Sequence, residues 1–168
     1  MIFRTEPMPS DLATNGCDLL FVYGTLRRGA SHHHILQSLH ARFLGPAMVA
    51  GELFDLGRFP GARAIEPTSA GIGGRRVTGE LYRLRRLEPD LAALDRYEGL
   101  QPSAFETSLF CRRVTRVWKQ NVGGAAQAWI YCLSRRPAAA CLIPSGDYSK
   151  AARRLRGSSG ASKRRARF

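Results

Sequence analysis

The chain has 168 residues, 44% of them hydrophobic, which is enough to bury one core but scarcely two. No apolar run approaches the roughly 18 residues that a membrane-spanning helix needs. Scattered acidic residues interrupt the N-terminal segment, where a secretory signal would carry an unbroken apolar block. Length and composition therefore argue against a helical membrane protein, and we expect a single domain in the cytoplasm.

The formal charge of +13 is concentrated at the C-terminal end of the chain. Eight of the 13 excess positive charges lie in residues 150–168, which hold no acidic residue and no apolar periodicity. This stretch predicts a flexible basic tail, suited to weak, salt-dependent contact with nucleic acid or an anionic surface. Residues 1–17 are polar and contain prolines, which predicts a flexible arm. The ordered domain is therefore expected over residues 18–149.

The predicted elements follow one another as strands with two inserted helices. Leu19–Tyr23 is a continuous β-forming run of the kind buried on both faces. Ser31 is suited to cap a helix that runs to His40. Further strands are predicted at Phe43–Ala47, Val49–Leu56, Val77–Leu84, Ser108–Trp118 and Ala126–Leu133, with a turn-rich loop over Leu56–Gly61 and a hairpin joining the last two strands. This order predicts an α+β single domain with a mixed, curved or barrel-like sheet and two main helices.

The first predicted strand ends in a segment bracketed by Gly24 and Gly29. Glycine adopts backbone angles that other residues resist, so main-chain N–H groups between the two glycines are expected to converge on an anion or a carbonyl oxygen. A turn that contains glycine also commonly ends a strand without any role in binding. The segment is therefore a candidate binding loop whose interpretation depends on the rest of the chain.

A second candidate site lies at the end of the helix predicted from Pro89 to Glu98, with Gly99 as its C-terminal cap. At 100° per residue, Glu98 falls among the apolar positions Leu91 and Leu94. Burial and the negative end of the helix dipole both disfavour a carboxylate there, so the pKa of Glu98 is expected to rise. Such a glutamate can accept and return a proton near neutral pH. The alternative is that the last turn frays and Glu98 faces solvent or pairs with an arginine.

Neither the cysteines nor the histidines predict a metal site. The four cysteines lie far apart in sequence without CxxC spacing, so they indicate neither a zinc site nor a redox motif and are expected to be reduced and mostly buried thiols. Adjacent histidines on a helix point in different directions, and no carboxylate lies within their segment. A solvated, capping or packing role is therefore preferred to metal binding for His32, His33, His34 and His40.

With these segments in this order, the chain resembles the γ-glutamylcyclotransferase-like proteins, which include the AIG2-like and γ-glutamylamine cyclotransferase branches. The resemblance extends from Leu19 to Tyr148, where Tyr148 stands in place of the Trp of many members. The matching segments are VYGTLRRG at 22–29, GELFDLG at 51–57, FPGA at 59–62, GELY at 79–82, LDRYEG at 94–99, AWIY at 128–131 and IPSGDY at 143–148.

The resemblance implies an intramolecular aminolysis, in which the α-amino nitrogen of a γ-glutamyl compound attacks its own γ-carbonyl to give 5-oxoproline and a free amine or amino acid. It implies that Glu98 is the general base and acid and that Tyr131 is a pocket tyrosine. No metal, cofactor or covalent enzyme intermediate is implied. The implied substrate-binding residues, through main-chain N–H groups of the loop, are Tyr23, Gly24, Thr25 and Leu26.

Two other functions are compatible with the sequence. One is a catalytically silent binding module that keeps the pocket for a small γ-glutamyl or carboxylate metabolite. The other is a nucleic-acid-associated protein in which the basic tail is the functional part. An intact Glu98 favours the enzyme over the binding module, and the confinement of charge to one terminus argues against the second alternative. The sequence specifies neither the leaving amine nor the oligomeric state.

Overall fold

The computed structural model describes residues 16–64, 74–100 and 108–149. The predicted basic tail and nearly all of the predicted N-terminal arm lie outside these ranges. Within them, no helix is long and apolar enough to cross a bilayer.

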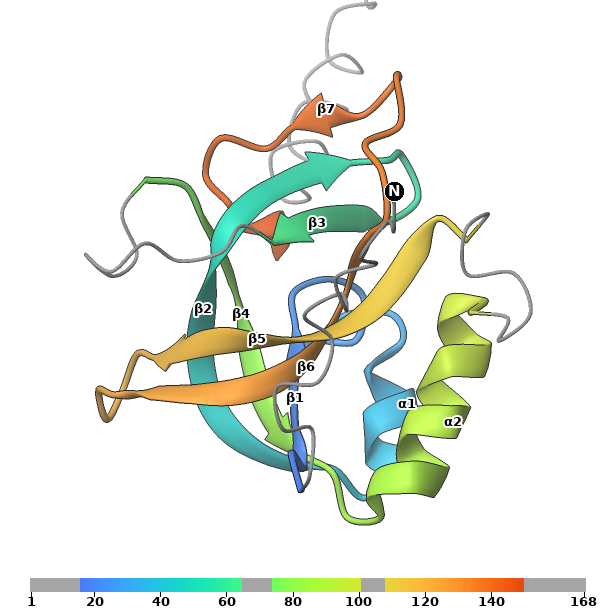
Figure 1. Cartoon of the computed structure of the whole chain (residues 1–168), viewed down its shortest axis with the longest axis vertical. Coiled ribbons are helices and arrows are strands. Elements are labelled where there is room, and N and C mark those ends of the chain that lie inside the picture. The colour runs from blue at the N-terminus through green and yellow to red at the C-terminus, as the bar shows by residue number, and fades with distance from the viewer. Residues whose placement is uncertain (1–15, 65–73, 101–107, 150–168) are drawn as a thin grey trace, which may run out of the picture.

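A closed five-stranded barrel forms the body of the described molecule. Its strands follow the order β2-β4-β1-β6-β5, and an additional pairing of β2 with β5 closes the ring. The β1–β6 pair is parallel and the other pairs are antiparallel. The closed ring, with two helices beside it, confirms the predicted α+β domain with a barrel-like sheet (Figure 1). The elements in chain order are β1 (Leu19–Val22), α1 (His33–Ser38), β2 (Arg42–Asp55), β3 (Pro60–Ala64), β4 (Arg76–Arg83), α2 (Leu87–Glu98), β5 (Phe110–Lys119), β6 (Ala125–Leu133) and β7 (Cys141–Leu142).

Strand β2 is a single element of 14 residues, so the prediction of two separate strands was wrong. The chain bends along β2 without losing its partners, because Met48 is paired with both Thr78 of β4 and Trp118 of β5. The second half of β2 leaves the barrel and pairs with β3 and β7. A continuous bent strand thus joins the barrel to a smaller sheet, as the curved ribbon shows (Figure 1).

Strands β3 and β7 were not predicted. The loop expected over Leu56–Gly61 ends at Phe59, because Leu56 N–H donates to the Phe59 carbonyl and closes a tight turn. The chain then enters β3 at Pro60. A proline at a strand's first residue costs no ladder hydrogen bond, so the turn signal concealed a strand start. The two residues of β7 are too few to give any periodic signal.

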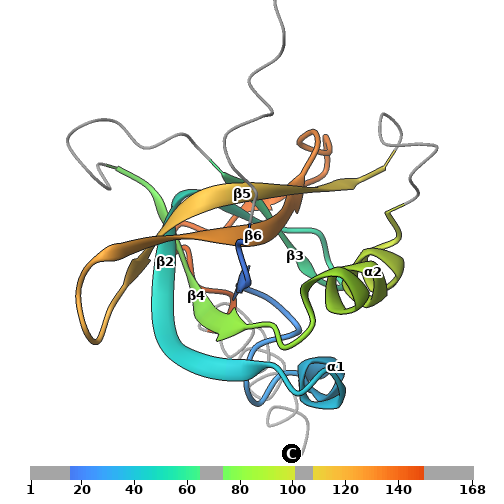
Figure 2. The same cartoon turned by 60° about the horizontal axis from the view of Figure 1, so that its bottom comes forward.

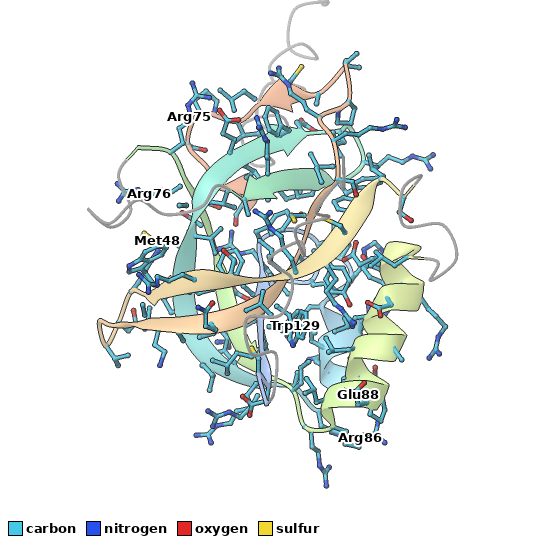
Figure 3. The ribbon with its side chains drawn as sticks, in the orientation of Figure 1. Met48, Arg75, Arg76, Arg86, Glu88 and Trp129 are labelled. Carbon is cyan, nitrogen blue, oxygen red and sulfur yellow. The ribbon has the colours of Figure 1, made fainter. Side chains whose placement is uncertain are left out.

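The side chains of β1 enter two different cores, which confirms that this strand is buried on both faces. Leu20 and Val22 belong to a core shared with the helices, whereas Phe21 belongs to a core inside the barrel. Both helices lie on the same side of the barrel (Figures 1 and 2). Trp129 of β6 packs against the helix-side core and projects toward that side (Figure 3).

Helix α2 begins at Leu87, two residues before the predicted start. The buried Asp90 accepts hydrogen bonds from the N–H groups of Arg85 and Arg86, so a carboxylate inside the first turn organises the helix start. The exposed Arg86 side chain lies at the same end of the helix (Figure 3). At the other end Gly99 has a φ of 70° and caps the helix, as predicted.

Helix α1 is shorter than predicted. It spans six residues, its N-cap is His32 rather than Ser31, and no side chain caps it. His40 lies beyond the helix with a φ of 53°, a left-handed conformation that ends the helical path. The helix is held instead by Leu36, which is fully buried in the helix-side core.

Candidate active site

A cavity of about 380 Å³ lies where the loop after β1 meets the C-terminal end of α2. It brings together all six residues predicted for the site, which come from positions up to 108 residues apart. The roles assigned to them stay predictions. The residues that line the cavity are Phe21, Val22, Tyr23, Gly24, Thr25, Leu26, His32, Arg58, Phe59, Pro60, Tyr97, Glu98, Phe110 and Tyr131.

The loop after β1 is a tight turn whose central N–H groups remain available. Arg27 N–H donates to the Gly24 carbonyl at 3.1 Å, which closes the turn. Within the described part of the chain, the N–H groups of Thr25 and Leu26 have no acceptor. Two adjacent unpaired N–H groups beside a cavity can donate to a bound anion or a developing oxyanion.

Gly24 serves a purpose other than the predicted one. Its φ is not in the left-handed region, unlike that of Gly29, which is 75°. A Cβ on Gly24 would lie 2.7 Å from Cγ of Pro60. Glycine is therefore needed at this position so that the loop can approach β3, and that approach closes one side of the cavity.

Glu98 is a partly buried carboxylate without a partner among the described residues. It lines the cavity from the last residue of α2, and among the described residues it makes no hydrogen bond or ion pair. Burial alone raises its pKa from 4.5 to about 7. The last turn of α2 is intact up to Glu98, and no arginine in the described ranges pairs with it, so the structure shows neither of the two alternatives. A group with this pKa can take up and release a proton at neutral pH.

Tyr23 and Tyr131 hold strands together around the cavity. The Tyr23 hydroxyl donates to the Tyr131 carbonyl at 2.7 Å and accepts from Ala62 N–H at 3.1 Å, which links β1, β6 and β3. The Tyr131 hydroxyl donates to Oδ1 of Asp95 in α2 at 2.6 Å. Burial raises the pKa of both phenols, so they remain protonated. Their hydroxyls position the site, and their rings line it.

Tyr97 is the nearest neighbour of Glu98 that the sequence interpretation did not select. Its hydroxyl lies 3.1 Å from Oγ1 of Thr25, which ties the binding loop to the end of α2. The ring of His32 packs edge-on against the Tyr97 ring at 5.6 Å. This packing role is the one preferred for the histidines, and no group of three potential metal ligands occurs in the described ranges. In the sequence, the only indication that Tyr97 belongs to the site was its position next to Glu98 in the segment LDRYEG.

The lining residues Arg58, Phe59 and Phe110 were also missed. Phe59 and Phe110 form an aromatic pair with ring centroids 5.9 Å apart. Arg58 is exposed, and no carboxylate in the described ranges pairs with it. These side chains come from the β2–β3 turn and the start of β5, which are close only in the folded chain.

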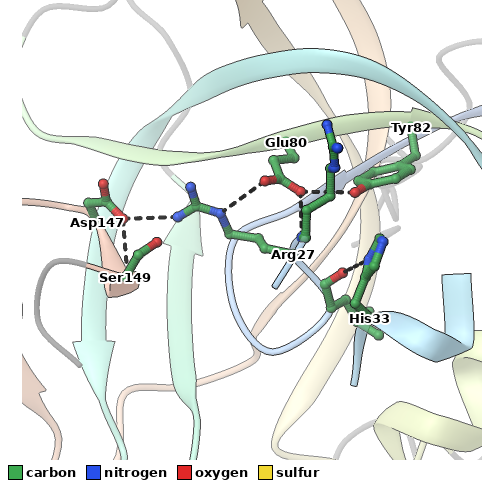
Figure 4. Close-up of polar contacts among 8 residues, drawn as sticks. Arg27, His33, Glu80, Tyr82, Asp147 and Ser149 are labelled. Carbon is green, nitrogen blue, oxygen red and sulfur yellow. Dashed lines mark hydrogen bonds and ion pairs between the residues drawn. The ribbon is translucent and has the colours of Figure 1, made fainter. Parts of the chain in front are cut away.

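A cluster of charges supports the far end of the binding loop (Figure 4). Arg27 Nη1 donates to Asp147 Oδ1 at 2.9 Å, and Arg27 Nε lies 3.8 Å from Oε1 of Glu80. Oε2 of Glu80 accepts from Arg28 N–H and from the Tyr82 hydroxyl, both at 2.9 Å. Burial opposes ionisation of Asp147, but the hydrogen bond and charge of Arg27 outweigh it and hold its pKa below the ordinary value.

Solved structures share this fold, and one of them is an AIG2-like protein. An AIG2-like protein from Mus musculus aligns with 25% identity and a TM-score of 0.57, over 72% of this chain and 80% of its own. YkqA from Bacillus subtilis aligns with 25% identity and a TM-score of 0.60, over 83% of this chain. The chain spans only 42% of YkqA.

The sequence comparisons identify the family. The family described as gamma-glutamyl cyclotransferase, AIG2-like, matches residues 20–150. A Vibrio cholerae protein named "Putative gamma-glutamylcyclotransferase" is 36% identical over 132 residues, which are 77% of this chain and 94% of that protein. The chain therefore belongs to the AIG2-like gamma-glutamyl cyclotransferase family.

Proposed function

We propose that this chain converts a γ-glutamyl amide into 5-oxoproline and a free amine or amino acid by intramolecular aminolysis. The observation that carries the proposal is the position of Glu98, an unpartnered carboxylate with a pKa of about 7, in the same cavity as two unpaired loop N–H groups. Family membership supports the same chemistry.

The proposed reaction uses Glu98 to carry protons, one at a time, from the attacking nitrogen to the departing nitrogen. The α-ammonium group of the substrate is not a nucleophile, so Glu98 first removes a proton from it. The amine nitrogen then attacks the γ-carbonyl carbon and closes a five-membered ring. Glu98 returns that proton to the departing nitrogen as the original amide C–N bond breaks. The ring nitrogen still holds one proton more than the neutral lactam, and Glu98 accepts this proton and passes it to the released amine, which leaves as an ammonium ion. Atoms balance, because the substrate divides into 5-oxoproline and a free amine without water or any other reactant.

The loop stabilises the charge that appears during ring closure. Attack places a negative charge on the former carbonyl oxygen, and the N–H groups of Thr25 and Leu26 are the proposed donors to it. A well-placed donor of this kind is typically worth about 3 kcal/mol in the transition state. Because both reacting groups belong to one molecule, the cavity also contributes by holding the glutamyl chain in a ring-like conformation.

A product assay tests the proposal. The purified full-length chain is incubated with a panel of γ-glutamyl amino acids and γ-glutamylamines, and 5-oxoproline and the released amine are quantified together. Equal amounts of both products from at least one substrate are expected. Binding of a γ-glutamyl compound without product, at high protein concentration, would instead identify the catalytically silent binding module.

A further inference from the structure

Two cysteines that are distant in sequence meet on the β5–β6 hairpin. Cys111 of β5 and Cys132 of β6 are directly opposed in the antiparallel register. Their sulfur atoms lie 3.5 Å apart, and both thiols are free. Cys111 is half-buried and Cys132 is buried. The two cysteines are 21 residues apart in sequence, and the hairpin closes this separation.

The backbone already satisfies the requirements of a disulfide. Opposed residues of an antiparallel pair have Cα atoms about 4.5–5.5 Å apart, inside the range of roughly 4.4–6.8 Å found in disulfides. The sulfur atoms would have to approach by about 1.5 Å from their separation of 3.5 Å to reach bonding distance. Side-chain rotation alone covers such a distance, so the strands need not separate.

We propose that Cys111 and Cys132 form a redox modification site that a peroxide closes into a cross-strand disulfide. The Cys111 thiolate attacks one oxygen of hydrogen peroxide, the O–O bond breaks, and a sulfenic acid and a hydroxide ion form. The hydroxide takes up the proton released when the thiol ionised and becomes the first water. The Cys132 thiol then attacks the Cys111 sulfur, the S–O bond breaks, and the oxygen leaves as a second water. Two thiols are oxidised by two electrons in total, and the peroxide is reduced to two waters.

Neighbouring groups distinguish the two thiols. The hydrogen bond from Cys132 lowers the pKa of Cys111, against the opposing effect of burial, and the charge of Arg113 lowers it further. Contact with Cys111 and burial raise the pKa of Cys132. Cys111 is also the more exposed of the two. These differences assign Cys111 as the thiol that meets the oxidant and Cys132 as the thiol that resolves the sulfenic acid.

Arg113 supplies an independent indication of an anion beside the pair. It lies two residues after Cys111, so both side chains point to the same face of β5. Its Nη2 donates to the Ala64 carbonyl at 2.7 Å, but its Nε is buried and has no acceptor among the described residues. A buried donor without a partner is costly, and a thiolate at Cys111 places a negative charge close to this cation.

The proposed site is separate from the cavity. Phe110 and Tyr131, which line the cavity, are the chain neighbours of Cys111 and Cys132, and adjacent strand residues point to opposite faces. The disulfide would therefore form on the other face of the hairpin and would not occupy the cavity. Its existence does not depend on the proposed function.

Oxidation of the reduced full-length protein tests the proposal. Treatment with hydrogen peroxide is expected to lower the count of free thiols from four to two. Intact mass should fall by two hydrogen atoms, and peptide mapping should find Cys111 joined to Cys132. Dithiothreitol should reverse both changes. A disulfide that joins two chains, or oxidation confined to Cys141 with Cys111 and Cys132 still open to alkylation, would overturn the proposal.

Variants assign the two roles. The double variant Cys17→Ser, Cys141→Ser should still lose two hydrogens, whereas Cys132→Ser should stop at a sulfenic acid on Cys111 that dimedone traps. Arg113→Met should slow peroxide consumption several-fold at pH 7 because the thiolate fraction falls. Arg116→Met, on the same strand but exposed, is the matched control and should leave the rate unchanged. Equal rates for the two arginine variants would contradict the assigned role of Arg113.

Discussion

Two ends of the same binding loop meet carboxylates in opposite electrical situations. Near Thr25 the loop faces Glu98, which is partly buried without a partner among the described residues and has a pKa of about 7. Beyond Arg27 it meets Glu80 and Asp147, whose side chains are only 12% and 11% exposed but are paired with the arginine. The same chemical group is thus able to exchange a proton at one end, whereas at the other end Arg27 lowers the pKa of Asp147 and holds it as an anion.

The difference separates the carboxylate assigned to the proposed proton transfer from the carboxylates that support the loop. Burial without a cation stores free energy in Glu98, because the anion is unfavourable and the proton is easily recovered. Burial with a cation and several donors removes that possibility from Asp147. The charged cluster can therefore hold the loop rigidly without competing for the proton that the proposed reaction moves.

The largest expected effect comes from Glu98→Gln. The amide keeps the shape of the side chain but cannot accept a proton, so kcat should fall by about 10²–10⁴. Glu88→Gln, at the exposed start of the same helix, is the matched control and should keep its activity. Steady-state kinetics with the best substrate of the panel measure both variants. An active Glu98→Gln variant would remove Glu98 from the proposed mechanism.

The pH dependence of the rate tests the state of the same carboxylate. Only the ionised form of Glu98 can remove the first proton, and its pKa is raised to about 7. The value of kcat/KM should therefore fall about tenfold per pH unit below pH 7 and level off above it. Rate measurements from pH 5 to pH 8 give the profile. An acidic limb near pH 4.5 would mean that the carboxylate is hydrated in the free enzyme.

Glu98 could be predicted from sequence because its signal is local. The helical period places it beside Leu91 and Leu94, and Gly99 marks the helix end two turns after Leu91, so burial follows from a segment of about a dozen residues. Strand β1 and the β5–β6 hairpin were predictable for the same reason. The order of these elements gave the fold class, and the motifs gave the family resemblance.

The charged cluster and the rest of the cavity could not be predicted in this way. Arg27 and Asp147 are 120 residues apart, and Arg28 N–H and Glu80 are 52 apart. No periodicity connects such positions, because they meet only after the barrel closes. The same holds for Arg58 and Phe110, which meet only in the folded cavity. Strand β3 was missed because the turn predicted over Leu56–Gly61 is present only up to Phe59, and the strand begins at Pro60.

Arg27→Met removes the cation that is paired with Glu80 and Asp147. It leaves the carboxylates of Glu80 and Asp147 buried without their cation, which should lower the free energy of unfolding by about 3 kcal/mol. Arg28→Met removes the neighbouring exposed arginine and should cost at most about 1 kcal/mol. Urea unfolding at pH 7 measures both.

A double variant separates charge from packing in that cluster. Adding Asp147→Asn to Arg27→Met neutralises one of the stranded anions, so the two substitutions together should cost less than the sum of their separate effects. Strict additivity would mean that Arg27 stabilises the loop through the packing of its side chain rather than through its charge.

Glu98→Gln should also change how the free energy of unfolding depends on pH. The folded-state pKa of Glu98 is raised from 4.5 to about 7, so folding binds a proton between these values and the protein loses stability as pH rises through 7. The glutamine variant lacks this loss. Its advantage over the parent should be about 2–3 kcal/mol greater at pH 8 than at pH 5. Denaturant unfolding at the two pH values measures the difference, and a constant advantage would contradict the raised pKa.

The smallest expected effect is at Thr25, where the loop and the helix end touch. Thr25→Val keeps the side-chain shape and both loop N–H groups but removes the hydrogen bond to Tyr97, which is worth about 1 kcal/mol. Activity should therefore fall less than about tenfold, with Tyr97→Phe giving a similar loss and the double variant little more. Kinetics of the three variants measure this coupling. A loss at Thr25→Val as large as that at Glu98→Gln would place the threonine hydroxyl, rather than the loop backbone, at the reacting carbonyl.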